Sequence, residues 1–161
     1  MIVLFLSSCL KDNPAVDFST VGTIIEILPP NGGGLENFDA AALEFTPTDA
    51  IDSADIDLNI ASPQPLKKDL TITLDIDDDL RTAYNTNHDT HFEAMPDSVF
   101  SFPVKSVTIP AGGRLDTVRV IFYPDKIDAT KNYMLPVSIK DAQGETISGN
   151  FGSIYFHTNV E

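Results

Sequence analysis

Four aspartates lie close together after an alternating segment, and carboxylate oxygens are the ligands that calcium prefers. They are Asp75, Asp77, Asp78 and Asp79. Their spacing lacks the glycine and the glutamate of an EF-hand loop, so a calcium ion here would need oxygens from a second loop. The alternative is that these aspartates are outward strand residues that lead into an acidic turn. The sequence therefore predicts no cofactor, with calcium as the one candidate.

Two imidazoles and a carboxylate come together in His88-Asp89-Thr90-His91. Such a group could share one metal ion. The spacing alone is weak, because the chain offers no second cluster with a third strong ligand, and His157 lies in a different segment. The alternative is a solvated polar loop, and we expect that outcome.

The same region has the side chains that a carbohydrate site requires. Sugars stack on exposed aromatic rings flanked by hydrogen-bonding groups, and the chain has no tryptophan, ten phenylalanines and four tyrosines. We expect a ligand-binding site, if the chain has one, at Tyr84, Asn85, His88 and Phe92. The alternative is that Tyr84 and Phe92 are anchors that cover one end of the fold, because aromatic rings bury large areas.

The single cysteine, Cys9, follows a short apolar run and the residues Leu6-Ser7-Ser8. This pattern resembles the bacterial lipobox, which implies that residues 1–8 are a signal peptide, truncated at its start, and that Cys9 is lipidated. The alternative is a buried N-terminal strand with an inert core cysteine. The charged residues after Cys9 resemble the surface-export signal of Bacteroidetes lipoproteins. We expect a lipid-anchored protein on the cell surface at the outer membrane, with the periplasmic face as the alternative.

Composition excludes several functions. With 24 acidic residues against 10 basic ones the formal net charge is −14, and this field repels a phosphate backbone, so nucleic acid is excluded as a partner. Neutral glycans, cations and basic protein surfaces remain. The sequence contains no G-x-S-x-G elbow, no P-loop and no dinucleotide fingerprint. We expect no enzyme activity.

The elements that must position these residues are mostly strands. Alternating apolar and polar residues predict about eight strands, at residues 23–28, 42–46, 56–60, 70–77, 106–109, 118–122, 134–139 and 153–158. Turns rich in proline and glycine separate them, and only residues 79–85 could form a helical turn or two. This arrangement predicts an all-β fold, a two-sheet antiparallel immunoglobulin-like β-sandwich of about seven to eight strands.

Two groups of motifs carry a family resemblance. One is Leu80-Arg81-Thr82-Ala83-Tyr84-Asn85 with Met95-Pro96, and the other is Val107 to Gly112 with Tyr133-Met134-Leu135-Pro136-Val137. Together they resemble a domain of unknown function at the N-terminus of Bacteroidetes surface lipoproteins of polysaccharide-utilisation systems. The resemblance implies an immunoglobulin-like β-sandwich that precedes a second domain involved with glycans.

We therefore divide the chain into a signal peptide (residues 1–8), a lipidated cysteine with a tether (9–20) and one sandwich domain (21–161). The expected function is a non-catalytic surface lipoprotein domain, accessory to glycan binding or uptake. The alternative is a structural spacer, or a docking module for a partner lipoprotein or an outer-membrane transporter. Docking would use an edge strand near residues 134–139, because Pro136 within a strand pattern predicts an edge or a bulge.

Overall fold

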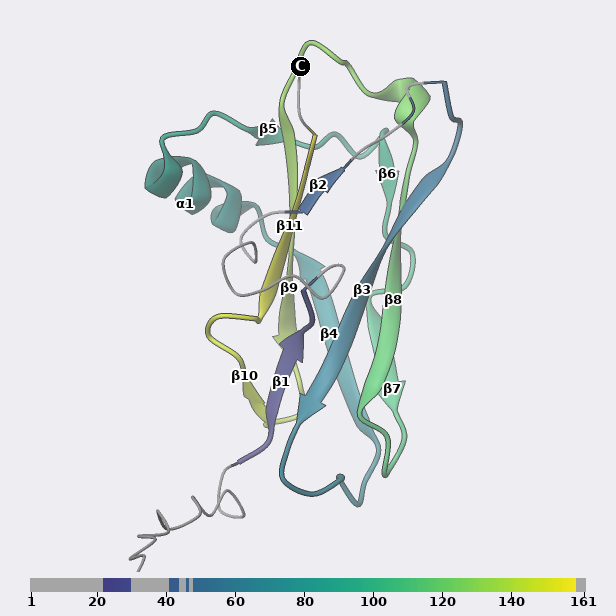
Figure 1. Cartoon of the computed structure of the whole chain (residues 1–161), viewed down its shortest axis with the longest axis vertical. Helices are drawn as coiled ribbons and strands as arrows, with labels where there is room; N and C mark the ends of the chain where they lie inside the picture. Colours follow the sequence, from purple (N-terminus) through teal and green to yellow (C-terminus); the bar gives the residue numbers. More distant parts are fainter. Residues whose placement is uncertain (1–21, 30–40, 44–45, 47, 159–161) are drawn as a thin grey trace, which may run out of the picture.

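The computed structural model describes residues 22–29, 41–43, 46 and 48–158, with only the backbone described for 41–43. Its elements are β1 (Ile24–Ile27), β2 (Ala41–Leu43), β3 (Asp52–Ala61), β4 (Leu70–Ile76), α1 (Asp78–His88), β5 (Glu93–Ala94), β6 (Phe100–Ser101), β7 (Ser106–Ile109), β8 (Leu115–Phe122), the 3-10 helix η3 (Pro124–Lys126), β9 (Tyr133–Asp141), β10 (Thr146–Ile147) and β11 (Ser153–Thr158). The strands form two sheets (Figure 1). One has the order β10-β1-β3-β8-β6, and the other has the order β2-β11-β9-β4-β7 with β5 beside β9.

The predicted β-sandwich is confirmed, since the inner faces of the two sheets share one apolar core. On β3 the buried residues alternate as Ile56, Leu58 and Ile60, and the residues between them face solvent. Across the sandwich, the rings of Phe122 and Phe156 meet edge to face with centroids 5.8 Å apart. Burying one such side chain stabilises the fold by about 1.5–3 kcal/mol, so the alternating strands suffice to hold the two sheets together.

The prediction of a purely antiparallel sandwich is wrong at three places. β1 pairs with β10, β11 with β2, and β5 with β9, each in parallel. Two of these parallel partners, β5 and β10, have two residues each. A segment of that length has no measurable alternation, so its pairing follows from the tertiary fold and not from a local pattern.

Helix α1 is longer than the turn or two predicted at residues 79–85. Asp78 and Asp79 lie in its first turn, where negative charge is favourable beside the helix N-terminus. The helix ends at His88, because Asp89 adopts a left-handed conformation with φ of 53° and donates its N–H to the Asn85 carbonyl. Aspartate is one of the few residue types that tolerate this conformation.

The predicted edge strand near Pro136 is wrong, because β9 lies between β11 and β4 in the sheet. Pro136 can sit inside the sheet because β4 ends beside it. The N–H of Asp77 donates to the Pro136 carbonyl (3.1 Å), while the Asp77 carbonyl accepts from Leu80 in the first turn of α1 (3.0 Å). The N–H that proline lacks is therefore not needed where the strand gives way to the helix.

Helix α1 stands outside the sandwich, beside the sheet that contains β9 and β11 (Figure 1). None of its residues is fully buried, so it is held by a few specific contacts and not by a broad apolar face. No helix within the described ranges is long and apolar enough to cross a membrane.

Candidate ligand-binding site at helix α1

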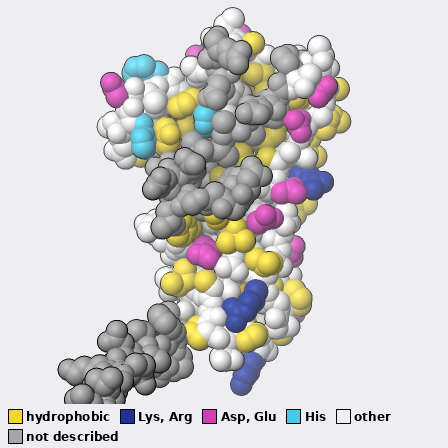
Figure 2. Space-filling view, viewed as in Figure 1, with side chains coloured by type: hydrophobic (Ala, Val, Ile, Leu, Met, Phe, Trp, Pro, Cys, Tyr) yellow, Lys and Arg dark blue, Asp and Glu magenta, His cyan; other side chains and the backbone are white. Residues whose placement is uncertain are grey.

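Five rings gather between α1 and β11, and we call them the ring cluster: Tyr84, His88, Phe92, Tyr155 and His157. Tyr84 is central. Its ring stacks on His88 (centroids 4.2 Å apart, planes 26° apart), meets the edge of Phe92 at 6.1 Å and lies 5.3 Å from Tyr155. Phe92 in turn lies 5.2 Å from His157. Figure 2 shows histidine side chains gathered at this end of the molecule.

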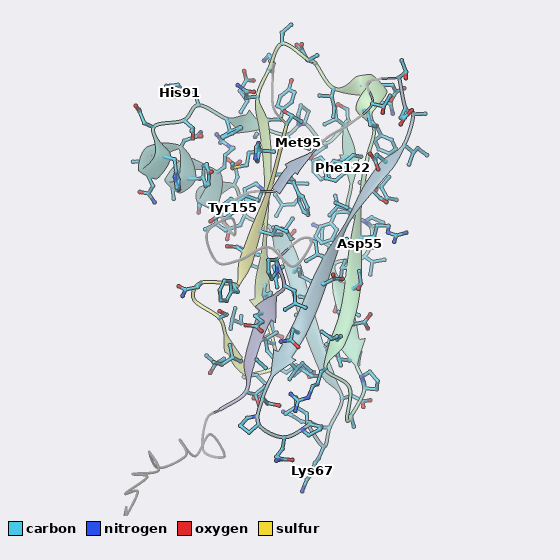
Figure 3. The ribbon with its side chains drawn as sticks, in the orientation of Figure 1. Asp55, Lys67, His91, Met95, Phe122 and Tyr155 are labelled. Carbon is cyan, nitrogen blue, oxygen red and sulfur yellow. The ribbon has the colours of Figure 1, made fainter. Side chains whose placement is uncertain are left out.

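The rings differ in how they meet solvent. His88 is exposed, whereas Tyr84, Phe92 and Tyr155 are half-buried. Tyr155 extends from β11 toward the helix (Figure 3). Because Tyr84 lies against both His88 and Tyr155, the imidazole of His88 is the most accessible ring of the three. The ring cluster thus joins α1 to the sandwich and also presents one flat ring to solvent.

Asn85 lies beside the cluster and is occupied by the main chain of the following loop. Its Nδ2 donates to the Phe92 carbonyl (2.9 Å), and its Oδ1 accepts from the Phe92 N–H (2.9 Å) and from the Thr90 hydroxyl (3.0 Å). The Phe92 carbonyl also accepts from Arg81 (2.9 Å). Asn85, predicted as a ligand-binding residue, therefore acts on the site by fixing the position of the Phe92 ring.

The structure brings the four predicted residues together and adds two that sequence reasoning missed. Tyr155 and His157 come from β11, far along the chain. The alternation of β11 does contain a signal, because Ile154 and Phe156 are buried and the residues between them must face outward. Nothing in the local pattern, however, says that a helix covers that outward face.

The charges around the ring cluster are mostly negative. Arg81 binds Asp78 through two bonds of 2.7 Å, and Lys131 binds Glu93 at 2.7 Å. The hydrogen bond from Arg81 holds the pKa of Asp78 below its usual value, and the same pairing raises the pKa of Arg81. The hydrogen bond to Glu93 likewise raises the pKa of Lys131. Both cations near the site are thus held by carboxylates.

The four candidate calcium ligands do not form one cluster. Asp75 binds Lys105 at 2.5 Å, Asp77 binds Lys140 and accepts from Ser138 at 3.2 Å, and Asp78 binds Arg81. The hydrogen bond from Lys105 holds the pKa of Asp75 below its usual value. No group of three or more metal-ligating side chains is present in the described part of the chain. The prediction of no cofactor, with calcium as a candidate at Asp75, Asp77, Asp78 and Asp79, stays untested.

The other sequence candidates have separate positions. His91 is exposed in the loop after α1, and His157 belongs to the ring cluster through Phe92. Cys9 lies outside the described residues, as do the signal peptide and the tether.

Fold and site together define a β-sandwich domain whose helix α1 is attached to the outside of a sheet by aromatic rings. The chain belongs to a family of N-terminal domains, described as "-like, N-terminal domain", which matches residues 34–146. No curated protein matches the chain in sequence.

Several solved structures share the fold. A multidomain protein from Bacteroides ovatus that includes DUF1735 has a TM-score of 0.68 and 16% identity, over 83% of this chain and 44% of that one. A candidate carbohydrate binding protein from the same species has a TM-score of 0.64 and 12% identity, over 77% and 36%. EndoBT-3987 of Bacteroides thetaiotamicron, solved with a Man5GlcNAc product, has a TM-score of 0.59 and 17% identity, over 75% and 28%.

The chain therefore spans less than half the length of these three structures. At such identities the similarity shows the fold. The expected resemblance to an N-terminal domain of Bacteroidetes proteins is confirmed.

Proposed function

We propose that this domain is a non-catalytic accessory to glycan binding at the bacterial surface, lipid-anchored through Cys9. One observation carries the proposal. The same fold forms part of a candidate carbohydrate binding protein and part of EndoBT-3987, a protein solved with a glycan product. These two proteins are described differently, yet both contain this fold. A shared accessory domain explains that better than a domain that carries the active site for one reaction.

The ring cluster supports a site for the glycan. The apolar face of a sugar ring packs on an aromatic plane, and polar groups at the rim bind its hydroxyls. The exposed imidazole of His88, backed by Tyr84, provides the plane. Asn87 and His91 are exposed in the last turn of α1 and in the loop after it, and provide hydrogen-bonding groups. A ligand at this site would contact the helix and not the sheets.

Three of the carboxylates are poor candidates for the general acid of a glycosidase. Glycoside cleavage by two carboxyl groups requires one of them to hold its proton near neutral pH, through a raised pKa. The hydrogen bonds from Arg119, Lys105 and Arg81 instead lower the pKa of Asp55, Asp75 and Asp78, respectively. These three acids are therefore poor proton donors.

The test is retention in native gels that contain polysaccharides, using the full chain with Cys9→Ser to prevent lipidation. We expect one polysaccharide to slow the wild-type chain, and His88→Ala to reduce that retention at least about fivefold, the size of one lost ring contact. Tyr123→Ala is the matched control, because Tyr123 is a half-buried ring that contacts Lys126 at 4.4 Å, outside the ring cluster. Unchanged migration across the whole panel would reject glycan binding.

A docking module is the second candidate, and one observation favours a particular place for it. β7 ends the order of its sheet, and Val104, just before it, is 55% exposed. A strand at the end of a sheet can pair with a strand of another protein. If no polysaccharide retards the chain, pull-downs from outer membranes with Val104→Asp as the control would test a partner lipoprotein or transporter.

A further inference from the structure

The charged groups around the ring cluster suggest which glycans it accepts. Residues 78–93 contain four acids, Asp78, Asp79, Asp89 and Glu93, but only one base, Arg81, and Lys131 is the one base that reaches them from outside this segment through a described ion pair. A charged ligand therefore meets more carboxylates than cations here.

Both cations already have a carboxylate partner, and Arg81 has all of its described donors in use. Arg81 uses Nε and Nη2 for Asp78 and Nη1 for the Phe92 carbonyl, and its side chain is only 19% exposed. The Nζ of Lys131 lies 2.7 Å from Glu93. An anionic sugar that took Arg81 from Asp78 would leave that carboxylate without its counter-ion, and one at Lys131 would lie beside the Glu93 carboxylate.

Two further carboxylates lie at the two ends of the helix. Asp79 is exposed in the first turn, and Asp89 is exposed directly after His88, the most accessible ring. A negative group on a sugar stacked on His88 would lie near Asp89. At low salt, repulsion between such charges extends over more than about 10 Å.

We propose that the ring cluster selects neutral glycans and rejects those that carry carboxylate or sulfate groups. This inference rests on the proposed glycan binding and adds the class of ligand. Asp79 and Asp89 are the residues that exclude anionic glycans, while Arg81 and Lys131 take no part in binding them.

The test compares one polymer in two charge states. Galactan, mannan, dextran and hydroxyethylcellulose are screened first in native gels at pH 8. The polymer that retards the chain is then oxidised at its primary hydroxyls to carboxylates, or sulfated where those hydroxyls are lacking. Gels at about 20 mM and about 500 mM salt separate electrostatic rejection from loss of a hydroxyl contact, because salt screens only the former.

We expect the anionic polymer to be retained at least about fivefold less at low salt, with the difference shrinking at high salt. The double variant Asp79→Asn/Asp89→Asn should recover retention, and asparagine tolerates the left-handed conformation of Asp89 as well as aspartate does. Asp116→Asn/Asp141→Asn removes the same charge at the far ends of β8 and β9 and should recover nothing.

Equal retention of both polymers at low salt would overturn the selectivity while leaving glycan binding intact. The selectivity would also be overturned if the anionic polymer is retained less and neither high salt nor Asp79→Asn/Asp89→Asn restores its retention. The cause would then be the shape of the modified sugar and not its charge. If no neutral polymer is retained but an anionic one is, the selectivity is wrong and glycan binding stands. Retention of neither class would reject both proposals.

Discussion

The side chain of Asn85 satisfies both main-chain groups of Phe92, accepting from its N–H and donating to its carbonyl at 2.9 Å each. The side chain of a helix residue thus makes the two hydrogen bonds to the loop that the main chain of a neighbouring strand would make. This relationship fixes the Phe92 ring against Tyr84, and with it one wall of the ring cluster.

Replacing Asn85 by alanine should destabilise the domain by about 1–3 kcal/mol, because the Phe92 N–H loses its partner in a half-buried place. The measurement is the free energy of unfolding in urea. Asn87→Ala, an exposed change on the same helix, should stay within about 0.5 kcal/mol of wild type. Equal effects of the two variants would show that the pairing with Phe92 contributes nothing.

Replacing Tyr155 by alanine should loosen α1 without loosening the sandwich. The helix has no fully buried residue, and Tyr155 is the β11 ring that Tyr84 packs against. Amide hydrogen exchange in α1 should accelerate about tenfold, the equivalent of one lost aromatic pair, while amides in β3 keep their protection. Tyr123→Ala is the control. Uniform acceleration in both elements would mean that Tyr155 supports the whole fold.

Stability should depend on pH through Asp78. The hydrogen bond from Arg81 lowers the pKa of Asp78 in the folded state below its usual value, so the ionised carboxylate stabilises the fold at any pH above that usual pKa. The contribution disappears as pH falls through the lower, folded-state pKa. Wild type should exceed Asp78→Asn in unfolding free energy at pH 7, by a modest amount since Asp78 is 53% exposed.

The two proteins should then converge as the pH falls below the folded-state pKa of Asp78, in urea unfolding measured at each pH. A difference that stays constant over the whole range would show that Asp78 acts through something other than its charge.

Calcium at millimolar concentration should leave the melting temperature unchanged. Asp75, Asp77 and Asp78 each bind a lysine or an arginine, and a calcium ion would have to displace these cations. Differential scanning fluorimetry with calcium, and with magnesium as the ionic-strength control, checks this. A rise in melting temperature specific to calcium would establish the site that the aspartate spacing suggests.

Local patterns predicted the strands well where one face of a strand is buried. β7 and β11 have the predicted bounds, and β4 differs by one residue, because each alternates over at least four positions. β6 has only two residues, which is too short to show alternation, so the sequence did not predict it. Pro136 was misinterpreted as a sign of an edge strand. A proline shows that a backbone N–H is missing, but it does not show whether a carbonyl on the neighbouring strand requires that N–H as a donor. Here Asp77 does not, since its carbonyl bonds within α1.

In the candidate site, too, the residues that are close in sequence were predicted and those that are distant in sequence were not. Tyr84, Asn85, His88 and Phe92 lie close together in sequence, and a helix followed by a turn brings them together in space. Tyr155 joins them only because β11 lies beside α1, which no short-range pattern encodes. The ion pairs of the aspartates were also hidden, because Lys105 and Lys140 come from other strands and loops.

The parallel pairing of β1 has a consequence for how the chain folds. Ile24 pairs with Ala61 on one side and with Thr146 on the other, about 120 residues later. β1 cannot complete both pairings until Thr146 has been synthesised, because its second partner, β10, lies that far along the chain. Folding should be slow, on the scale of milliseconds to seconds, and β1 should be the last strand to gain protection in pulse-labelling experiments.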